Sequence, residues 1–153
     1  MSQDDYVIRV AIAGTGRMGQ AIAAALEQQE DMELAGLWGR GDDLDALVAS
    51  ADVVIDFSLP AGTGQVLDSV VRQGKPLVCG VSGLDDEMMD RLDKAASTVP
   101  VVYDRNMSLG VAVLERSVRE AAASLGMDFS VAVSEVHHIH KIDAPSGTAL
   151  KLG

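Results

Sequence analysis

The chain has 153 residues, the length of one ordinary domain, and its 48% hydrophobic and 23% charged residues are typical of a globular protein. Twelve Lys and Arg against 23 Asp and Glu give a net charge of −11, which argues against nucleic acids and anionic membrane surfaces as partners. The single cysteine, Cys79, cannot form an internal disulfide, and no apolar run approaches the ~18 residues of a membrane helix. We therefore expect a cytoplasmic protein.

The N-terminal part of the chain alternates apolar segments with helical patterns. Strands are expected at residues 6–13, 32–38, 52–57, 76–80 and 99–103, and helices at residues 18–30, 44–50, 61–73 and 85–97. Asp42 or Asp43 is available to cap the second of these helices. Because the strands are apolar throughout and amphipathic helices separate them, we predict an α/β fold, a Rossmann-type doubly wound parallel sheet with helices on both faces.

The C-terminal part follows a different pattern. Residues 109–125 carry apolar side chains at helical spacing, whereas Phe129, Val131 and Val133 alternate with small or polar residues over residues 129–135. A period of two predicts a strand with one buried face, and hence a second sheet. We predict a first domain at residues 1–106 and the start of a second, mixed α+β domain at residues 107–153. The second domain looks truncated, because one strand and a helix start cannot form an independent fold.

A glycine-rich loop joins the first strand to the first helix. Its residues, Gly14-Thr15-Gly16-Arg17-Met18-Gly19, match the pattern G-x-G-x-x-G. In this pattern the first glycine permits a tight turn, the second lets the backbone approach a pyrophosphate, and the third lets the helix pack close to the strand. The alternative is a structural turn without a ligand. In its strand–turn–helix setting, the loop predicts that residues 1–106 form a dinucleotide-binding domain.

The end of the second strand bears on which dinucleotide is bound. An NAD-binding version of the loop expects Asp or Glu about 20 residues on, to accept from the ribose hydroxyls. Here the strand ends in Leu37-Trp38-Gly39-Arg40, without a carboxylate. Arg40 is the right residue type for a 2′-phosphate. We expect NADPH to be favoured over NADH, although nearby Asp42 and Asp43 leave dual use open.

All three histidines lie within four positions, as His137, His138 and His140. One interpretation is a metal site, such as zinc, formed with Glu135 and Asp143, although adjacent histidines on an extended segment point apart. A polar surface loop without a function is another alternative.

The second functional interpretation is a cationic, proton-donating pocket. Lys141 would join the two adjacent histidines beside the start of a helix that Ser146 caps. Gly147 and Thr148 would then offer N–H and hydroxyl donors to a carboxylate. Functional groups concentrate on loops of this kind, so the cluster is the strongest candidate for the chemistry.

Several segments resemble one known family. Residues 135–149 read EVHHIHKIDAPSGTA and resemble throughout the E-x-H-H-x-x-K-x-D-x-P-S-G-T-A signature of the 4-hydroxy-tetrahydrodipicolinate reductases, also called dihydrodipicolinate reductases. Residues 10–19 resemble the family's nucleotide loop, and residues 56–60 and 80–83 resemble the turns that hold the nicotinamide half of the cofactor. Residues 106–108 resemble the N-x-S turn that enters its substrate domain.

The resemblance implies an NAD(P)H-dependent oxidoreductase that reduces 4-hydroxy-tetrahydrodipicolinate to tetrahydrodipicolinate in diaminopimelate and lysine biosynthesis. It implies that His137 and Lys141 are the proton-donating pair, and leaves open which of them donates. His138, Lys141, Ser146, Gly147 and Thr148 are then expected to hold the substrate's carboxylates. The expected cofactor contacts are Gly14, Thr15, Gly16, Arg17, Met18, Gly19, Arg40, Phe57, Ser58, Gly80, Val81, Ser82, Asp104, Arg105, Asn106 and Met107.

The resemblance further implies a small dicarboxylate substrate, a homo-oligomer and no metal. Family members are substantially longer, so this chain is expected to be part of a longer reductase or a short natural relative. Two other functions compete with the reductase: a nucleotide-binding module that has lost turnover, and a metal-dependent enzyme. Lys141 and the segment from Pro145 to Thr148 favour the reductase over the metal enzyme, because a metal site does not require them.

Overall fold

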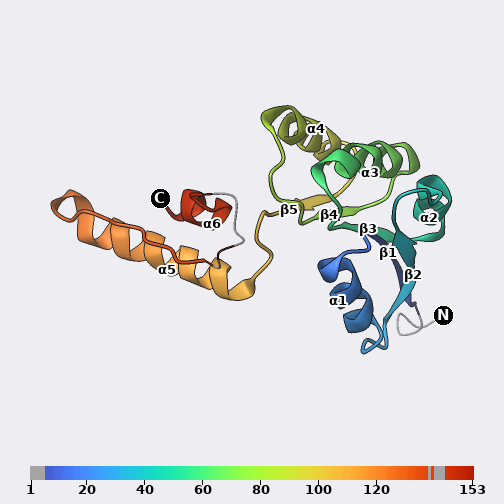
Figure 1. The fold of residues 1–153 in the computed structure, drawn as a ribbon, viewed down its shortest axis with the longest axis horizontal. Coiled ribbons are helices and arrows are strands. Elements are labelled where there is room, and N and C mark those ends of the chain that lie inside the picture. Colours follow the sequence, from blue (N-terminus) through green and yellow to red (C-terminus); the bar gives the residue numbers. More distant parts are fainter. Residues whose placement is uncertain (1–5, 138, 140–143) are drawn as a thin grey trace. The chain divides into compact units, whose positions relative to one another are not determined.

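The structure, a computed structural model, describes residues 6–137, 139 and 144–153. The chain divides into two compact units, Met1–Asp104 and Arg105–Gly153, and each is described here by itself (Figure 1). The domain border predicted after residue 106 falls near the start of the second unit. No helix in the described part of the chain has the length and apolar character needed to cross a membrane.

The first unit contains a five-stranded parallel sheet in the order β2-β1-β3-β4-β5 (Figure 1). Its strands are β1 (Ile8–Ala13), β2 (Met32–Trp38), β3 (Val53–Asp56), β4 (Leu77–Cys79) and β5 (Val101–Tyr103). Each strand lies inside the segment predicted for it. Chain order reverses at β1, which places a topological switch point between β1 and β3, the position where open α/β sheets bind ligands.

Helices cover both faces of this sheet, which confirms the doubly wound fold. They are α1 (Arg17–Leu26), α2 (Leu44–Ser50), α3 (Pro60–Gln73) and α4 (Asp86–Ala96). On one face, Ala23 and Leu26 of α1 pack with Val10 and Ile12 of β1. On the other face, α2, α3 and α4 pack against Ala11, the intervening residue of β1, and its neighbours. Alternate residues of one strand therefore serve two separate apolar cores.

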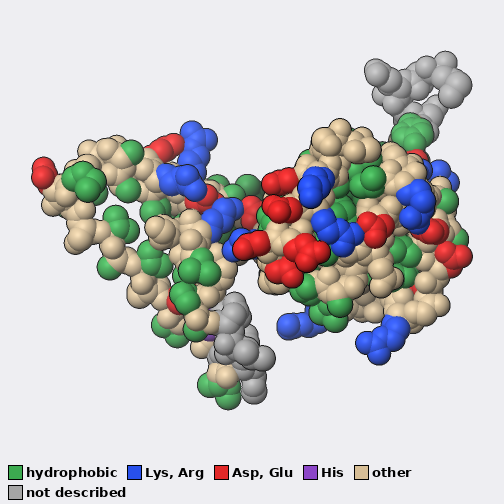
Figure 2. Space-filling view, turned by 90° about the horizontal axis from the view of Figure 1, so that it is seen from above, with side chains coloured by type: hydrophobic (Ala, Val, Ile, Leu, Met, Phe, Trp, Pro, Cys, Tyr) green, Lys and Arg blue, Asp and Glu red, His purple; other side chains and the backbone are tan. Residues whose placement is uncertain are grey.

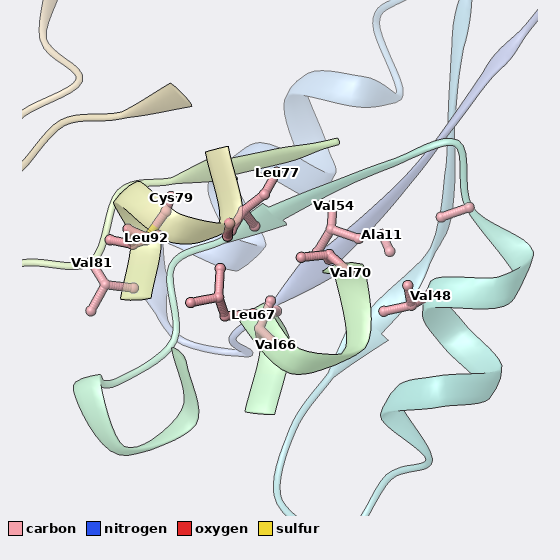
Figure 3. Close-up of a cluster of buried hydrophobic side chains, with 13 residues drawn as sticks. Ala11, Val48, Val54, Val66, Leu67, Val70, Leu77, Cys79, Val81 and Leu92 are labelled. Carbon is pink, nitrogen blue, oxygen red and sulfur yellow. The ribbon is translucent and has the colours of Figure 1, made fainter. Parts of the chain in front are cut away.

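The larger core lies between the sheet and helices α2, α3 and α4 (Figure 3). Val48, Val66 and Leu92, one from each helix, belong to the same buried cluster as Val54 and Leu77 of the sheet. All five side chains are essentially inaccessible to solvent. Burial of an aliphatic side chain of this size stabilises the fold by about 1.5–3 kcal/mol, so this cluster is the main apolar contribution to the first unit.

Aspartates fix where two of these helices begin. Asp43 accepts the N–H of Ala46 at 3.0 Å and caps α2, which decides between the two caps that the sequence offered. Asp85 accepts the N–H of Met88 at 2.9 Å and caps α4. Helix α3 ends at a glycine: Gly74, which follows its last residue, adopts a left-handed conformation and stops the helix.

The second unit contains α5 (Leu109–Leu125), the short 3-10 helix η2 (Gly126–Asp128) and α6 (Gly147–Leu152). Helix α5 has the predicted bounds, and Ser108 caps it by accepting the N–H of Val111 at 3.4 Å. Apolar side chains are spread over the visible surface of this unit (Figure 2). Among them Val113, Leu114 and Phe129 are at least half exposed.

The strand predicted at residues 129–135 is wrong. The structure gives this segment no strand, and the side chains of Phe129, Val131 and Val133 are 60%, 64% and 46% exposed. A strand needs a neighbour to satisfy its backbone and bury one face. Among the described residues from Arg105 onward there is no second strand to provide one, so the predicted mixed α+β character is absent from the described part of this unit.

Cys79 lies in the larger core and reports on its opening. Its side chain is inaccessible to solvent, and burial raises the pKa of the thiol to about 11. Both effects suppress thiolate formation, and the thiolate is the species that reacts with alkylating reagents. Cys79 should therefore react slowly in the folded protein and rapidly once the first unit unfolds.

The close approach of α1 to the sheet is testable by adding one methyl group. At Gly19 a side chain would collide with the carbonyl oxygen of Gly14. We expect Gly19→Ala to lower the free energy of unfolding by at least about 1–3 kcal/mol, the usual cost of overpacking. Urea unfolding, followed by Trp38 fluorescence and by the labelling rate of Cys79, measures this change.

Gly64→Ala is the matched control. Its methyl group would meet only the ends of two flexible side chains, Arg91 at 3.0 Å and Met88 at 3.3 Å. Alanine also has the higher helix propensity, so this variant should be as stable as the parent or slightly more stable. If Gly19→Ala unfolds at the same urea concentration as the parent, the contact with Gly14 is not a packing constraint.

Candidate functional site

The parallel register aligns the carboxyl ends of all five strands. Trp38, Ala13, Asp56, Cys79 and Tyr103 occupy one row across the sheet. The residue after each of them begins a loop at the same edge. These loops contain the predicted cofactor residues of the first unit, so the structure brings together segments that are far apart in the sequence.

Backbone hydrogen bonds fix where these loops begin. Gly14 donates to Trp38 at 2.9 Å, Phe57 donates to Ala13 at 2.8 Å, and the N–H of Gly80 donates to the carbonyl oxygen of Asp56 at 2.9 Å. Each bond links the first loop residue of one strand to the last residue of a neighbouring strand. The loops therefore leave the sheet from fixed positions.

The three glycines of the first loop play different structural parts. Gly14 has a φ of +112°, and a Cβ atom there would lie 2.5 Å from the carbonyl oxygen of Phe57, so only glycine fits. At Gly19 any side chain would collide with the carbonyl oxygen of Gly14. Gly16 has ordinary extended dihedral angles, and nothing lies within 4 Å of the position of its Cβ atom. Its backbone thus borders open space that a ligand can approach.

The start of α1 is left without a protein cap. Gly16 supplies no capping side chain, and the first turn contains no acidic residue. By contrast, α2 and α4 begin with aspartate caps. The first N–H groups of α1 and its positive dipole end suit an anion such as a pyrophosphate. Thr15, Arg17 and Met18 beside them are exposed.

The two aspartates of the loop after β2, Asp42 and Asp43, accept hydrogen bonds from backbone N–H groups close to them in the chain. Asp42 accepts the N–H of Gly39 at 2.8 Å, and its carbonyl oxygen accepts the indole N–H of Trp38 at 3.2 Å. Asp43 is occupied as the cap of α2. Arg40 is exposed and makes no ion pair with any residue that the structure describes.

This loop also lies against the glycine-rich loop. A Cβ atom at Gly39 would lie 3.1 Å from the methyl group of Thr15. Arg40, the residue after Gly39, is therefore close to the turn in which Gly16 borders open space. The structure thus brings together two of the features that the sequence analysis assigned to one dinucleotide.

Asp56 is a buried carboxyl group at the end of β3, predicted from the sequence only as part of the cofactor turn at residues 56–60. Its side chain is inaccessible to solvent and accepts the N–H of Ser58 at 2.8 Å. Burial raises the pKa of this carboxyl group, and hydrogen bonds from Ser58 and Thr63 oppose the rise. It fixes the turn that contains Phe57 and Ser58. A charged residue that ends an apolar strand was the signal for it.

The turns after β3 and β4 pack on each other. A Cβ atom at Gly80 would collide with the ring of Phe57, so these two predicted cofactor residues are in direct contact. Val81 is buried in the larger core and can offer a ligand only its backbone, whereas Ser82 is exposed. Asp104 follows β5 and donates its N–H to Cys79 at 3.2 Å.

In the second unit, Glu135 connects two predicted site residues. One of its carboxylate oxygens accepts the backbone N–H of Ser146 at 2.8 Å. The other accepts the hydroxyl of Ser146 and lies 2.9 Å from Nε2 of His137. Hydrogen bonds from Ser146 and then from His137 lower the pKa of Glu135 to about 2. From the sequence, Glu135 is a possible metal ligand and the first residue of the family signature, without a role toward His137 or Ser146.

The segments around residues 106 and 148 also meet within this unit. Asn106 donates from its side-chain amide to the hydroxyl of Thr148 at 3.0 Å, and its side-chain oxygen accepts the N–H of Ser108 at 3.0 Å. A Cβ atom at Gly147 would lie 3.7 Å from the side chain of Arg105. Residues expected to contact cofactor therefore lie beside residues expected to bind substrate. Met107, in the same segment, is exposed.

Ser146 caps α6 as predicted, by accepting the N–H of Ala149 at 3.1 Å. His138 and Lys141, expected to act on the substrate, lie outside the described residues. Within residues 6–137, 139 and 144–153 there is no group of three or more His, Cys, Asp or Glu side chains that could hold a metal ion. His140 and Asp143 of the metal hypothesis also lie outside that part of the chain.

Comparison with known proteins covers both units. Residues 8–107 match the family model "Dihydrodipicolinate reductase, N-terminus", and residues 110–153 match "Dihydrodipicolinate reductase, C-terminus". A protein of Caulobacter vibrioides named 4-hydroxy-tetrahydrodipicolinate reductase is 46% identical over 156 residues, which cover 95% of this chain and 61% of that protein. A Campylobacter jejuni protein of the same name is 40% identical over 147 residues, which cover 95% of this chain and 60% of that protein. The chain thus spans about 60% of the length of these relatives.

Solved structures agree on the fold. A dipicolinate-bound dihydrodipicolinate reductase from Paenisporosarcina sp. TG-14 superposes with a TM-score of 0.74 at 24% identity, covering 95% of this chain and 64% of that one. A scyllo-inositol dehydrogenase from Lactobacillus casei superposes with a TM-score of 0.57 at 17% identity, covering 79% of this chain and 43% of that one. Since family models match 8–107 and 110–153, and the signature at residues 135–149 is intact, the chain belongs to the dihydrodipicolinate reductase family.

Proposed function

We propose that this chain binds NADPH or NADH and serves in the reduction of 4-hydroxy-tetrahydrodipicolinate to tetrahydrodipicolinate, a step of diaminopimelate and lysine biosynthesis. The observation that carries the proposal is the open glycine-rich loop at Gly16, at the edge where the other predicted cofactor loops also begin. The relatives' name supplies the reaction. The signature segment supplies side chains of the right chemistry.

The first unit fits a dinucleotide. The uncapped start of α1 and the open backbone at Gly16 suit the pyrophosphate, and the packed turns at Phe57 and Gly80 border the same edge. When bound, the nicotinamide supplies the hydride. What the protein itself contributes there is a rigid arrangement of loops, since each begins at a hydrogen bond to a neighbouring strand.

NADPH is the proposed preference. Asp42 and Asp43, the acidic residues close to the end of β2, are both engaged by their own loop. Neither is therefore offered to the ribose hydroxyls as an NAD-specific carboxylate would be. Arg40 is exposed beside them and suits the added phosphate of NADPH.

The second unit is proposed to hold the substrate and provide the proton. A dianionic substrate must be captured by local donors in a chain of net charge −11. We assign that task to His138, Lys141, Gly147 and Thr148, and the proton to His137 or Lys141. Ser146 donates both its N–H and its hydroxyl to Glu135, so its part is to shape the turn rather than to bind the substrate.

Nucleotide binding is tested at the open glycine. Gly16→Ala puts a methyl group where the pyrophosphate is proposed to approach, while leaving the fold unstrained because no protein atom lies within 4 Å. We expect NADPH affinity to fall by about 10- to 100-fold, equivalent to about 1–3 kcal/mol of overpacking. Energy transfer from Trp38, the single tryptophan, to NADPH measures binding in the 153-residue chain. Unchanged affinity would remove the glycine loop from the proposal.

The nucleotide preference is tested at Arg40. Arg40→Ala should weaken NADPH binding by about 10- to 100-fold, because a charge-assisted hydrogen bond to the phosphate is lost. NADH binding should stay within about twofold of the parent. Lys94→Ala removes one positive charge from α4 and serves as the control for net charge. Tighter binding of NADH than of NADPH by the parent chain would contradict the assignment.

The chemistry is tested at the signature segment. In the active enzyme that contains this sequence, His137→Ala and Lys141→Ala should each lower turnover by about two to four powers of ten, the range of general acid–base catalysis. NADPH affinity should be nearly unchanged, since the pyrophosphate is held at residues 14–19. Steady-state kinetics with freshly generated substrate, beside nucleotide titrations, measures both. Parental turnover in both variants would show that the segment is structural.

A further inference from the structure

The carboxylate of Glu135 decides which nitrogen of His137 carries a proton. An ionised carboxylate only accepts hydrogen bonds. Hydrogen bonds from Ser146 and His137 keep the pKa of Glu135 low, at about 2, so it is ionised at neutral pH. Nε2 of His137 lies 2.9 Å from that carboxylate. The proton of this contact therefore lies on Nε2. The other ring nitrogen, Nδ1, is left to exchange protons with another partner.

Ser146 prevents the carboxylate from turning away. Its backbone N–H donates to one carboxylate oxygen at 2.8 Å, and its hydroxyl donates to the other, the same oxygen that faces His137. Ser146 is 5% exposed and caps α6. Glu135 is thus fixed between the turn proposed to bind the substrate and the imidazole proposed to act on it.

We propose that Glu135 is a positioning residue: it holds His137 with Nε2 protonated, so that Nδ1 is the atom that delivers a proton to the substrate. The inference rests on the proposed function and takes His137, rather than Lys141, as its proton donor. In the step itself the Nδ1–H bond of the imidazolium breaks and the proton passes to the substrate. The neutral imidazole that remains keeps its other proton on Nε2, which still donates to the carboxylate of Glu135. A carboxylate that holds a histidine in one tautomer is an established way to prepare it for proton transfer.

Glutamine at position 135 reverses the tautomer. Its side chain has the same length but presents one oxygen and one NH2 group. The backbone N–H of Ser146 can only donate, so the amide oxygen must face it, and the NH2 group then faces the Ser146 hydroxyl and His137. Both of those groups can accept instead. A neutral His137 must therefore accept at Nε2 and carry its proton on Nδ1.

Nuclear magnetic resonance of the labelled 153-residue chain tests this directly. Long-range imidazole ¹H–¹⁵N spectra, recorded at an alkaline pH at which the ring signals no longer change with pH, distinguish the two neutral tautomers. His137→Gln assigns the His137 signals. We expect Nε2–H in the parent chain and Nδ1–H in Glu135→Gln. The control is Glu120→Gln, on the exposed face of α5 where Glu120 pairs with Arg116 at 2.9 Å, and it should leave the tautomer of His137 unchanged.

Kinetics separates positioning from a structural role. In the active enzyme, Glu135→Gln should lower kcat by about 10- to 100-fold, while the KM for substrate stays within about threefold because Ser146 keeps its backbone partner. A changed KM and melting temperature with an unchanged tautomer would overturn the proposal. So would an Nδ1–H form in the parent chain.

The two proposals fail in different ways. If the tautomer switches as expected but His137→Ala retains parental turnover, Glu135 controls the tautomer of His137 but His137 is not the proton donor, so the positioning role is overturned while Lys141 remains the donor of the proposed function. If His137→Ala loses turnover but Glu135→Gln keeps the parental tautomer, the proposed function stands and the positioning role is overturned.

Discussion

The turn at residues 14–19 brings α1 so close to the sheet that no side chain fits at Gly14 or Gly19. Gly14 lies against the backbone of Phe57, and the ring of Phe57 fills the space beside Gly80. The turns after β1, β3 and β4 are therefore packed on one another at the carboxyl edge of the sheet. Within this tight arrangement Gly16 remains open. One steric constraint thus both closes the fold and leaves a place for a ligand.

The carboxylates near the proposed sites are paired with hydrogen-bond donors of the chain itself. Anionic ligands face a net charge of −11, yet the carboxylates nearest the proposed sites are already engaged. Asp42 accepts from Gly39, Asp43 caps α2, and Glu135 accepts from Ser146 and His137. Hydrogen bonds from the protein stabilise each of these ionised carboxylates, because charge-assisted hydrogen bonds are stronger than neutral ones. Arg40 is exposed and makes no ion pair among the described residues, so its charge is available to an anionic ligand.

Asp56 and Glu135 show opposite effects of their surroundings. Burial raises the pKa of Asp56, so its ionised form is disfavoured in the folded state, and the stability that its protonated form contributes is lost as pH rises through that raised pKa. Hydrogen bonds lower the pKa of Glu135 to about 2, so its contribution is present above its ordinary pKa and is lost as pH falls towards 2. The first group fixes a turn beside the proposed nucleotide site, and the second fixes an imidazole.

The sequence alone determined the parallel sheet, the helices, the glycine-rich loop and the family signature, because hydrophobic period, helix caps and glycine spacing are local properties. It failed at residues 129–135, where alternation predicts a strand but a strand requires a neighbour supplied by tertiary structure. Only the structure chose Asp43 over Asp42 as the cap of α2, and only it gave Asp56 and Glu135 their roles. Their partners are set by where turns lie in space: Glu135 meets Ser146 across eleven positions of chain, a contact that no local pattern encodes.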